Sequence, residues 1–138
     1  MYRWRNALEV ELRQLMAPLL IAALWLVACG LRAARDAQSS ADPRGSDRLS
    51  KRGAWWNYAH SWRNKYKAWP ADTRPRFPGA TTWAAGLTDF WHCAQMVTTV
   101  CIAAALLIAA QGVTWWQVLL ALVPGSLAFE PMYRRLRR

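Results

Sequence analysis

Three long apolar runs, separated by strongly basic segments, constrain this 138-residue chain more than any other feature. Hydrophobic residues make up 54% of the chain, yet its mean hydropathy is −0.04, so apolar and charged residues are segregated into blocks. Disordered chains lack such apolar runs, and soluble domains disperse their apolar residues with helical or strand periodicity. The pattern predicts an all-α integral membrane protein with about three transmembrane helices. The ten Trp residues fit this class, because Trp concentrates at membrane–water interfaces.

The first apolar run starts at Leu15 and meets its first charge at Arg32. This length is close to the minimum for crossing a hydrocarbon core of about 30 Å at 1.5 Å per residue. We expect residues 1–14 to be helical and to lead directly into a first span over 12–34, with Pro18 near its start. A surface or re-entrant helix is the alternative, and it would move the N-terminus to the other side of the membrane.

Two further apolar runs follow one another closely near the C-terminus. The second span is expected over 88–110 and the third over 113–129, with a tight turn at Gln111-Gly112 between them. So short a connection predicts an antiparallel helical hairpin. We expect the pair Pro124-Gly125 to interrupt the third run.

The segment between the first two spans combines aromatic and basic residues. Aromatic side chains recur at steps of four and three, which predicts one amphipathic helix over 49–69. Rings on one side and cations on the other are typical of a helix in a headgroup layer. The predicted interface residues are Trp55, Trp56, Trp62, Tyr66, Trp69, Lys51, Arg52, Arg63, Lys65 and Lys67. The alternative is that these aromatics pack on the rest of the protein.

Ser, Asp, Pro and Gly dominate residues 36–48, which we interpret as a linker, and three Pro and a Gly predict an extended loop over 70–82. These boundaries predict three regions. They are 1–34, with the first span; 35–82, a basic Trp-rich cytoplasmic loop; and 83–138, the helical hairpin and basic tail.

The distribution of cations predicts the orientation. The loop with its flanks holds eleven Lys and Arg and the tail four, against three in the N-terminal flank. Basic segments stay on the cytoplasmic side. We therefore expect a multi-pass protein of a bacterial inner membrane with a cytoplasmic C-terminus. The cations flank apolar runs, so anionic lipids are the expected partners rather than nucleic acid.

Three polar residues near the second span are candidates for a site. Asp89 and His92 share one helix face, and His60 in the preceding segment is able to approach them. A His60/Asp89/His92 metal site is one hypothesis. We favour the other, in which Asp89 interacts with the helix dipole and His92 bonds a neighbour, with no metal and no cofactor.

The three Cys residues do not form a disulfide framework, since their number is odd and two lie in one apolar run. The stretch Leu26-Val27-Ala28-Cys29-Gly30 is similar to a bacterial lipoprotein processing box, in which the Cys is lipidated. Acidic residues before it and the basic loop after it oppose export, so lipidation of Cys29 remains the minor alternative.

Three stretches resemble segments of small integral membrane proteins from bacteria and their phages. They are residues 60–67 (His-Ser-Trp-Arg-Asn-Lys-Tyr-Lys), 77–82 (Phe-Pro-Gly-Ala-Thr-Thr) and 88–92 (Thr-Asp-Phe-Trp-His). That group carries no established activity. The resemblance implies that the aromatic segment, the Pro/Gly loop and the start of the second span act as one unit.

These features predict a non-enzymatic anchor or accessory subunit of a membrane assembly. It would pair with copies of itself or with another membrane protein. The first alternative is a phage holin-like pore-forming protein, which has a similar size and span count but rarely so large a Trp-rich insert. The second alternative is a membrane enzyme that uses the His/Asp site.

Overall fold

The computed structural model describes residues 2–39 and 49–137, and most of the linker predicted over 36–48 lies outside these residues. The long helices are α1 (Tyr2–Ser39), α3 (Phe90–Ala109) and α4 (Trp115–Arg137). Between α1 and α3 come a 3-10 turn (Ser50–Arg52), α2 (Tyr58–Ser61), a second 3-10 turn (Trp62–Lys65), the strands β1 (Tyr66–Ala68) and β2 (Asp72–Pro75), and a third 3-10 turn (Ala85–Leu87).

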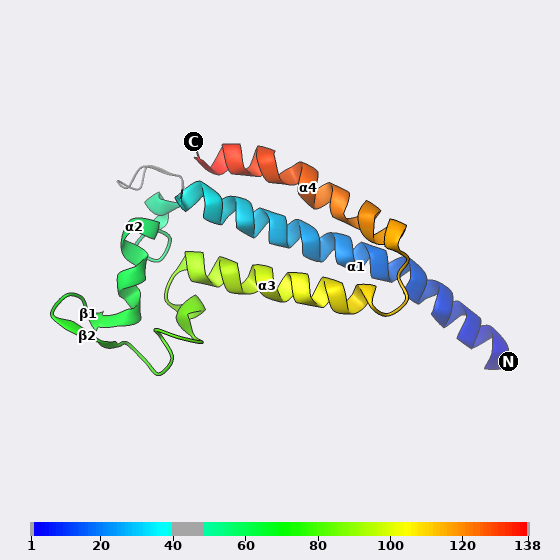
Figure 1. Ribbon diagram of the computed structural model, residues 1–138, viewed down its shortest axis with the longest axis horizontal. Coiled ribbons are helices and arrows are strands. Elements are labelled where there is room, and N and C mark those ends of the chain that lie inside the picture. Colours follow the sequence, from blue (N-terminus) through cyan, green and yellow to red (C-terminus); the bar gives the residue numbers. More distant parts are fainter. Residues whose placement is uncertain (1, 40–48, 138) are drawn as a thin grey trace.

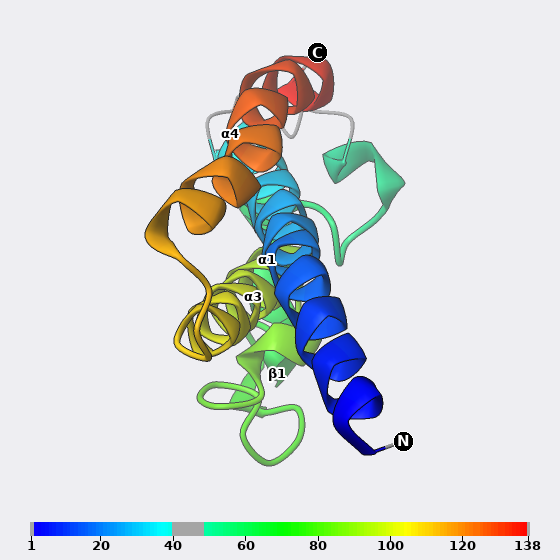
Figure 2. The ribbon, with the colours of Figure 1, turned by 90° about the vertical axis from the view of Figure 1, so that its right-hand side faces the viewer.

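Helix α1 is the central element of the fold. It lies between α3 and α4, α4 runs parallel to it, and α3 runs in the opposite direction (Figures 1 and 2). The predicted hairpin of the last two helices is therefore antiparallel in direction, but each of its arms packs mainly on α1 rather than on the other. Near the α3–α4 turn, Ile21, Ala105 and Ala121 form a small buried cluster that joins all three helices.

Among the described residues, two helices are long and apolar enough to cross a membrane, Glu11–Ser39 within α1 and α3 itself. The predicted continuity of residues 1–14 with the first run is confirmed, because α1 is one helix and includes Pro18. The expected interruption at Pro124-Gly125 was wrong, since α4 continues through Pro124 and Pro131 to Arg137. Packing against α1 along its length holds α4 helical there.

The helices place small side chains inside and large apolar ones outside. The buried positions of the bundle include Ala28, Ala33, Cys101, Ala105, Ala121 and Gly125. By contrast, Leu19 of α1, Leu106 of α3 and Leu127 of α4 are 64%, 66% and 72% exposed. Small interior residues allow close approach of helices, a pattern typical of helices packed within lipid.

Residues 49–89, which we call the cap, fold at the end of the bundle where α1 ends and α3 begins (Figure 1). The predicted single helix over 49–69 was wrong. Gly53 has φ 131°, outside the helical region, and Asn57 starts the short helix α2 by accepting a hydrogen bond from the Ala59 N–H. The backbone of Tyr66 is already extended. The helical structure in this segment is therefore limited to α2, before Trp62, and to the one 3-10 turn that follows it.

The extended loop predicted over 70–82 is partly a strand. β2 pairs with β1 in an antiparallel hairpin, and Trp69-Pro70 is a cis peptide bond in its turn. Arg74 donates hydrogen bonds to both Asp72 carboxylate oxygens, at 2.8–3.2 Å, and these bonds lower the pKa of Asp72 below its ordinary value. On the same hairpin the rings of Tyr66 and Trp69 lie 5.2 Å apart.

An aromatic cluster joins the cap to the bundle. The Phe90 ring lies 5.7 Å from Trp55 and 4.6 Å from Trp56, and it packs with Leu49 and with Ala34 of α1. The Phe90 N–H donates to the Trp55 carbonyl at 3.0 Å. The cap is thus held in a fixed position at the start of α3.

Candidate functional site

Asp89 is the N-cap residue of α3. Its backbone is extended (φ −157°), and its carboxylate accepts a hydrogen bond from the His92 N–H at 3.0 Å. The His92 imidazole Nδ1 lies 2.9 Å and 2.8 Å from the two carboxylate oxygens. Asp89 thus lies at the start of the helix, where the helix dipole favours a negative charge, and His92 bonds to it. Asp89 is only 1% exposed, whereas the His92 side chain is 32% exposed, so the pair joins a buried carboxylate to a half-buried imidazole.

Neighbouring side chains hold the backbone around Asp89. The Thr88 hydroxyl lies 2.6 Å from the Ala85 carbonyl and 3.1 Å from the Asp89 carboxylate. The Asn64 side-chain amide donates to the Thr88 carbonyl at 3.1 Å. Asn64 belongs to the cap's second 3-10 turn, so the segments 60–67 and 88–92 meet directly at this point.

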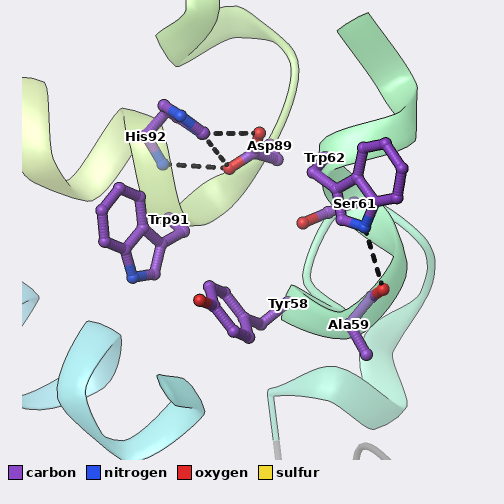
Figure 3. Close-up of a pocket in the computed structure, with 7 residues that line it drawn as sticks. All are labelled: Tyr58, Ala59, Ser61, Trp62, Asp89, Trp91 and His92. Atoms are coloured by element: carbon purple, nitrogen blue, oxygen red, sulfur yellow. Dashed lines mark hydrogen bonds and ion pairs between the residues drawn. The ribbon is translucent and has the colours of Figure 1, made fainter. Parts of the chain in front are cut away.

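A cavity of about 350 Å³ opens between α2 and the start of α3. Figure 3 shows the residues around it, which are Tyr58, Ala59, Ser61, Trp62, Asp89, Trp91 and His92. Ser61 is only 2% exposed, and its hydroxyl points into the cavity (Figure 3). The site thus combines aromatic walls, a buried carboxylate paired with a half-buried imidazole, and a hydroxyl that points into the cavity.

Arginine side chains lie on two of the aromatic walls. The guanidinium of Arg35, on α1, lies 5.5 Å from the centre of the Trp91 ring. The guanidinium of Arg63 lies 5.5 Å from the centre of the Trp62 ring. These cation–π contacts place two positive charges beside the cavity, and the Arg35 contact links the cavity to α1.

His60, the third residue of the proposed metal site, does not join the other two. It is exposed on α2, while its neighbours Ala59 and Ser61 line the cavity. Among the described residues, no group of three or more His, Cys, Asp or Glu is placed to hold a metal ion. The structure therefore brings Asp89 and His92 together and leaves His60 outside.

The predicted interface residues separate into two groups. Trp55 and Trp56 pack on Phe90. Their rings therefore contact the rest of the protein, which is the alternative to a membrane-interface role. Trp62, Tyr66 and Trp69 form a second cluster, in which the Trp62 ring lies 5.0 Å from the Trp69 ring. The cations at 51, 52, 63 and 67 are exposed, and Lys65 is half-buried.

Sequence reasoning missed four residues that build the cavity. Tyr58, Ser61 and Trp91 line it, and Arg35 reaches the Trp91 ring from α1. The one local signal was Asn57, a favoured N-cap residue that indicates a helix start directly before Tyr58. The contact of Arg35, on α1, with Trp91 depends on tertiary packing, so the local sequence gives no sign of it.

Comparison with known proteins adds no relative: the chain matches no protein-family model, no curated protein and no solved structure.

Replacing Asp89 tests its role as a cap. We expect Asp89→Ala to lower the free energy of unfolding in detergent by about 2–4 kcal/mol, because it removes an N-cap and leaves the His92 backbone N–H and Nδ1 without their carboxylate partner. Asp89→Asn keeps an acceptor and should cost only about 1 kcal/mol. Asp72→Ala, in the exposed hairpin, is the control and should change the value by less than about 0.5 kcal/mol. Equal losses for Asp89→Asn and Asp89→Ala would contradict the capping role.

Proposed function

We propose that the chain is a multi-pass protein of a bacterial inner membrane, which anchors the cap at the cytoplasmic face as an accessory subunit of a membrane assembly. The observation that carries the proposal is the packing of small residues inside and large apolar residues outside. In water, so many exposed Leu and Val side chains would form an apolar surface far larger than soluble monomers tolerate. In a bilayer the same side chains would contact the hydrocarbon chains of the lipids.

Helix α4 is the proposed third span. It has 23 residues, and a helix of that length covers about 34 Å at 1.5 Å per residue. Exposed Trp115 and Trp116 lie at its start, and Tyr133 with three arginines lies at its end. Aromatic residues at one boundary and cations at the other are typical of a span with its basic end in the cytoplasm.

The cap lies at the same end of the bundle as the C-terminus, opposite the N-terminus (Figure 1). With three spans, the fifteen cations of loop and tail would face the cytoplasm and the three of the N-terminal flank would lie outside. The exposed cations of the cap and the ring of Trp69, which is 41% exposed, would then meet anionic headgroups.

Induced expression in bacteria separates this proposal from the holin-like alternative. We expect the membrane potential, followed with a voltage-sensitive dye, to stay constant after induction, because a small three-helix anchor opens no pore. A C-terminal fusion to a reporter that fluoresces only in the cytoplasm, placed after Arg138, should be bright. The variant Gly125→Leu, expected to misassemble the bundle, is the comparison for non-specific toxicity. Abrupt depolarisation by the native chain alone would favour a holin.

A further inference from the structure

The cavity between α2 and the start of α3 has the size and the lining of a ligand site. Its volume of about 350 Å³ lies within the range of small-molecule sites in proteins. Buried polar groups normally find a hydrogen-bond partner. Ser61 is 2% exposed and its hydroxyl points into this space, while the indole N–H of Trp91, another lining residue, is buried and has no partner among the described residues.

The charges around the cavity restrict what it accepts. A cation would approach the Trp62 and Trp91 rings, each of which already carries an arginine guanidinium 5.5 Å from its centre. An anion would meet the Asp89 carboxylate, which lines the cavity at its inner end. Charges of both signs therefore lie around the cavity, and Arg35 is itself paired with Asp36 at 3.2 Å. Neither a cation nor an anion gains from these surroundings as a whole, so an uncharged ligand is the best fit.

The lining groups also restrict the shape and polarity of the ligand. The aromatic side chains of Tyr58, Trp62 and Trp91 form walls suited to a planar ring. The hydroxyl groups of Ser61 and Tyr58 are able to donate hydrogen bonds to oxygen atoms on such a ring. Because Asp89 binds Nδ1 of His92, the other ring nitrogen, Nε2, is the one left for a ligand. Figure 3 shows Ser61 and His92 on different sides of the cavity, so the polar groups of the ligand should lie at different edges of its ring.

We propose that this cavity binds the ring of a lipid-soluble para-quinone. Such a ring is planar and uncharged, and it carries carbonyl oxygens at opposite ends. The inference rests on the proposed membrane location, which places the start of α3 near the headgroup layer, where a quinone dissolved in the bilayer reaches the cavity. Only binding is assigned here, with no electron transfer.

Calorimetric titration of the full chain in neutral detergent tests the proposal. The probes are decylubiquinone, which has an apolar tail, and menadione, which lacks one. We expect saturable binding of both, at one per chain. Ser61→Ala should weaken binding about two- to tenfold, the range for one hydrogen bond. Tyr58→Phe, which keeps the ring, should weaken it similarly, and it carries the test if Ser61→Ala does not fold. Ser39→Ala, on the exposed end of α1, is the matched control and should bind like the native chain.

Several results would overturn the assignment. Absence of saturable binding, or equal binding by the Ser61→Ala, Tyr58→Phe and native chains, would show that the cavity is not a quinone site. Binding of decylubiquinone without menadione would mean that the tail, not the ring, is recognised. Competition by choline or inorganic phosphate would refute an uncharged ligand. If the chain bound menadione but failed the tests of membrane topology, the quinone site would stand. Only the entry of the quinone from the bilayer would be rejected.

Discussion

Phe90→Ala is expected to release the cap from the bundle. Phe90 is 7% exposed and packs on Trp55, Trp56 and Ala34, so its removal leaves a cavity in the aromatic cluster that joins the cap to the bundle. Phe→Ala changes in packed cores cost about 3–5 kcal/mol. Since each 1.4 kcal/mol is tenfold, the population of the opened cap should rise roughly a hundredfold or more.

Limited trypsin digestion measures this opening, because the cap carries many Lys and Arg, and cleavage follows the population of the open form. Fragments cut between residues 51 and 76 should appear much faster in Phe90→Ala than in the native chain. Phe129→Ala is the matched control: Phe129 stacks on Tyr133 of its own helix and is only half-buried. Equal cleavage of Phe90→Ala and the native chain would contradict the proposed attachment of the cap.

Gly125→Leu is expected to force α4 away from α1. A Cβ atom at Gly125 would lie 2.6 Å from Cδ1 of Trp25, 3.0 Å from the Trp25 carbonyl oxygen and 3.1 Å from the Leu26 nitrogen. Two of these atoms belong to the α1 backbone and have no room to move. Overpacking costs about 1–3 kcal/mol and occasionally more. We expect about 1–3 kcal/mol for Gly125→Ala and a larger loss for Gly125→Leu, measured as unfolding in detergent.

Gly30→Ala is the control for this close approach. A Cβ atom there would meet the terminal methyl of Met132 at 2.9 Å, and that methyl is the far end of a flexible side chain. The substitution should therefore be neutral, or slightly stabilising because Ala favours a helix. If Gly125→Ala were as well tolerated as Gly30→Ala, the contact of α4 with Trp25 would not hold the bundle together.

The long helices were predictable from the sequence because an apolar run needs no knowledge of its neighbours. The helix predicted over 1–34 and the span predicted over 88–110 match α1 (Tyr2–Ser39) and α3 (Phe90–Ala109) with small boundary errors. The continuity of α4 through Pro124 was not predictable in this way. A proline in a helix interior is costly in isolation, and only packing of neighbouring helices compensates for it.

In the cap, residues with helical spacing do not form one helix, because they pack against different parts of the protein. The spacing of Trp55, Trp62, Tyr66 and Trp69 fits one helix face. In the structure, Trp55 packs on Phe90, and the other three rings lie together beside the hairpin. The position of Gly53 was the local sign that the helix is broken, because its positive φ suits Gly alone.

The candidate site was predicted in part. Asp89 and His92 are three residues apart on one helix, so their contact follows from local geometry. Ser61 and Trp62 lie almost thirty residues earlier and reach the same cavity only because the cap folds back on α3. That return depends on Phe90, Asn64 and Thr88, whose contacts are tertiary.

Cysteine labelling in spheroplasts tests the central claim, three spans with a cytoplasmic cap. Native cysteines are replaced by alanine, and Gln111→Cys, Lys67→Cys and Arg137→Cys are made one at a time at exposed positions. Gln111 lies at the α3–α4 turn, Lys67 in the cap and Arg137 in the tail. A membrane-impermeant maleimide should label Gln111→Cys in intact spheroplasts, and the other two only after permeabilisation. Labelling of Gln111→Cys and Lys67→Cys from the same side would contradict the account.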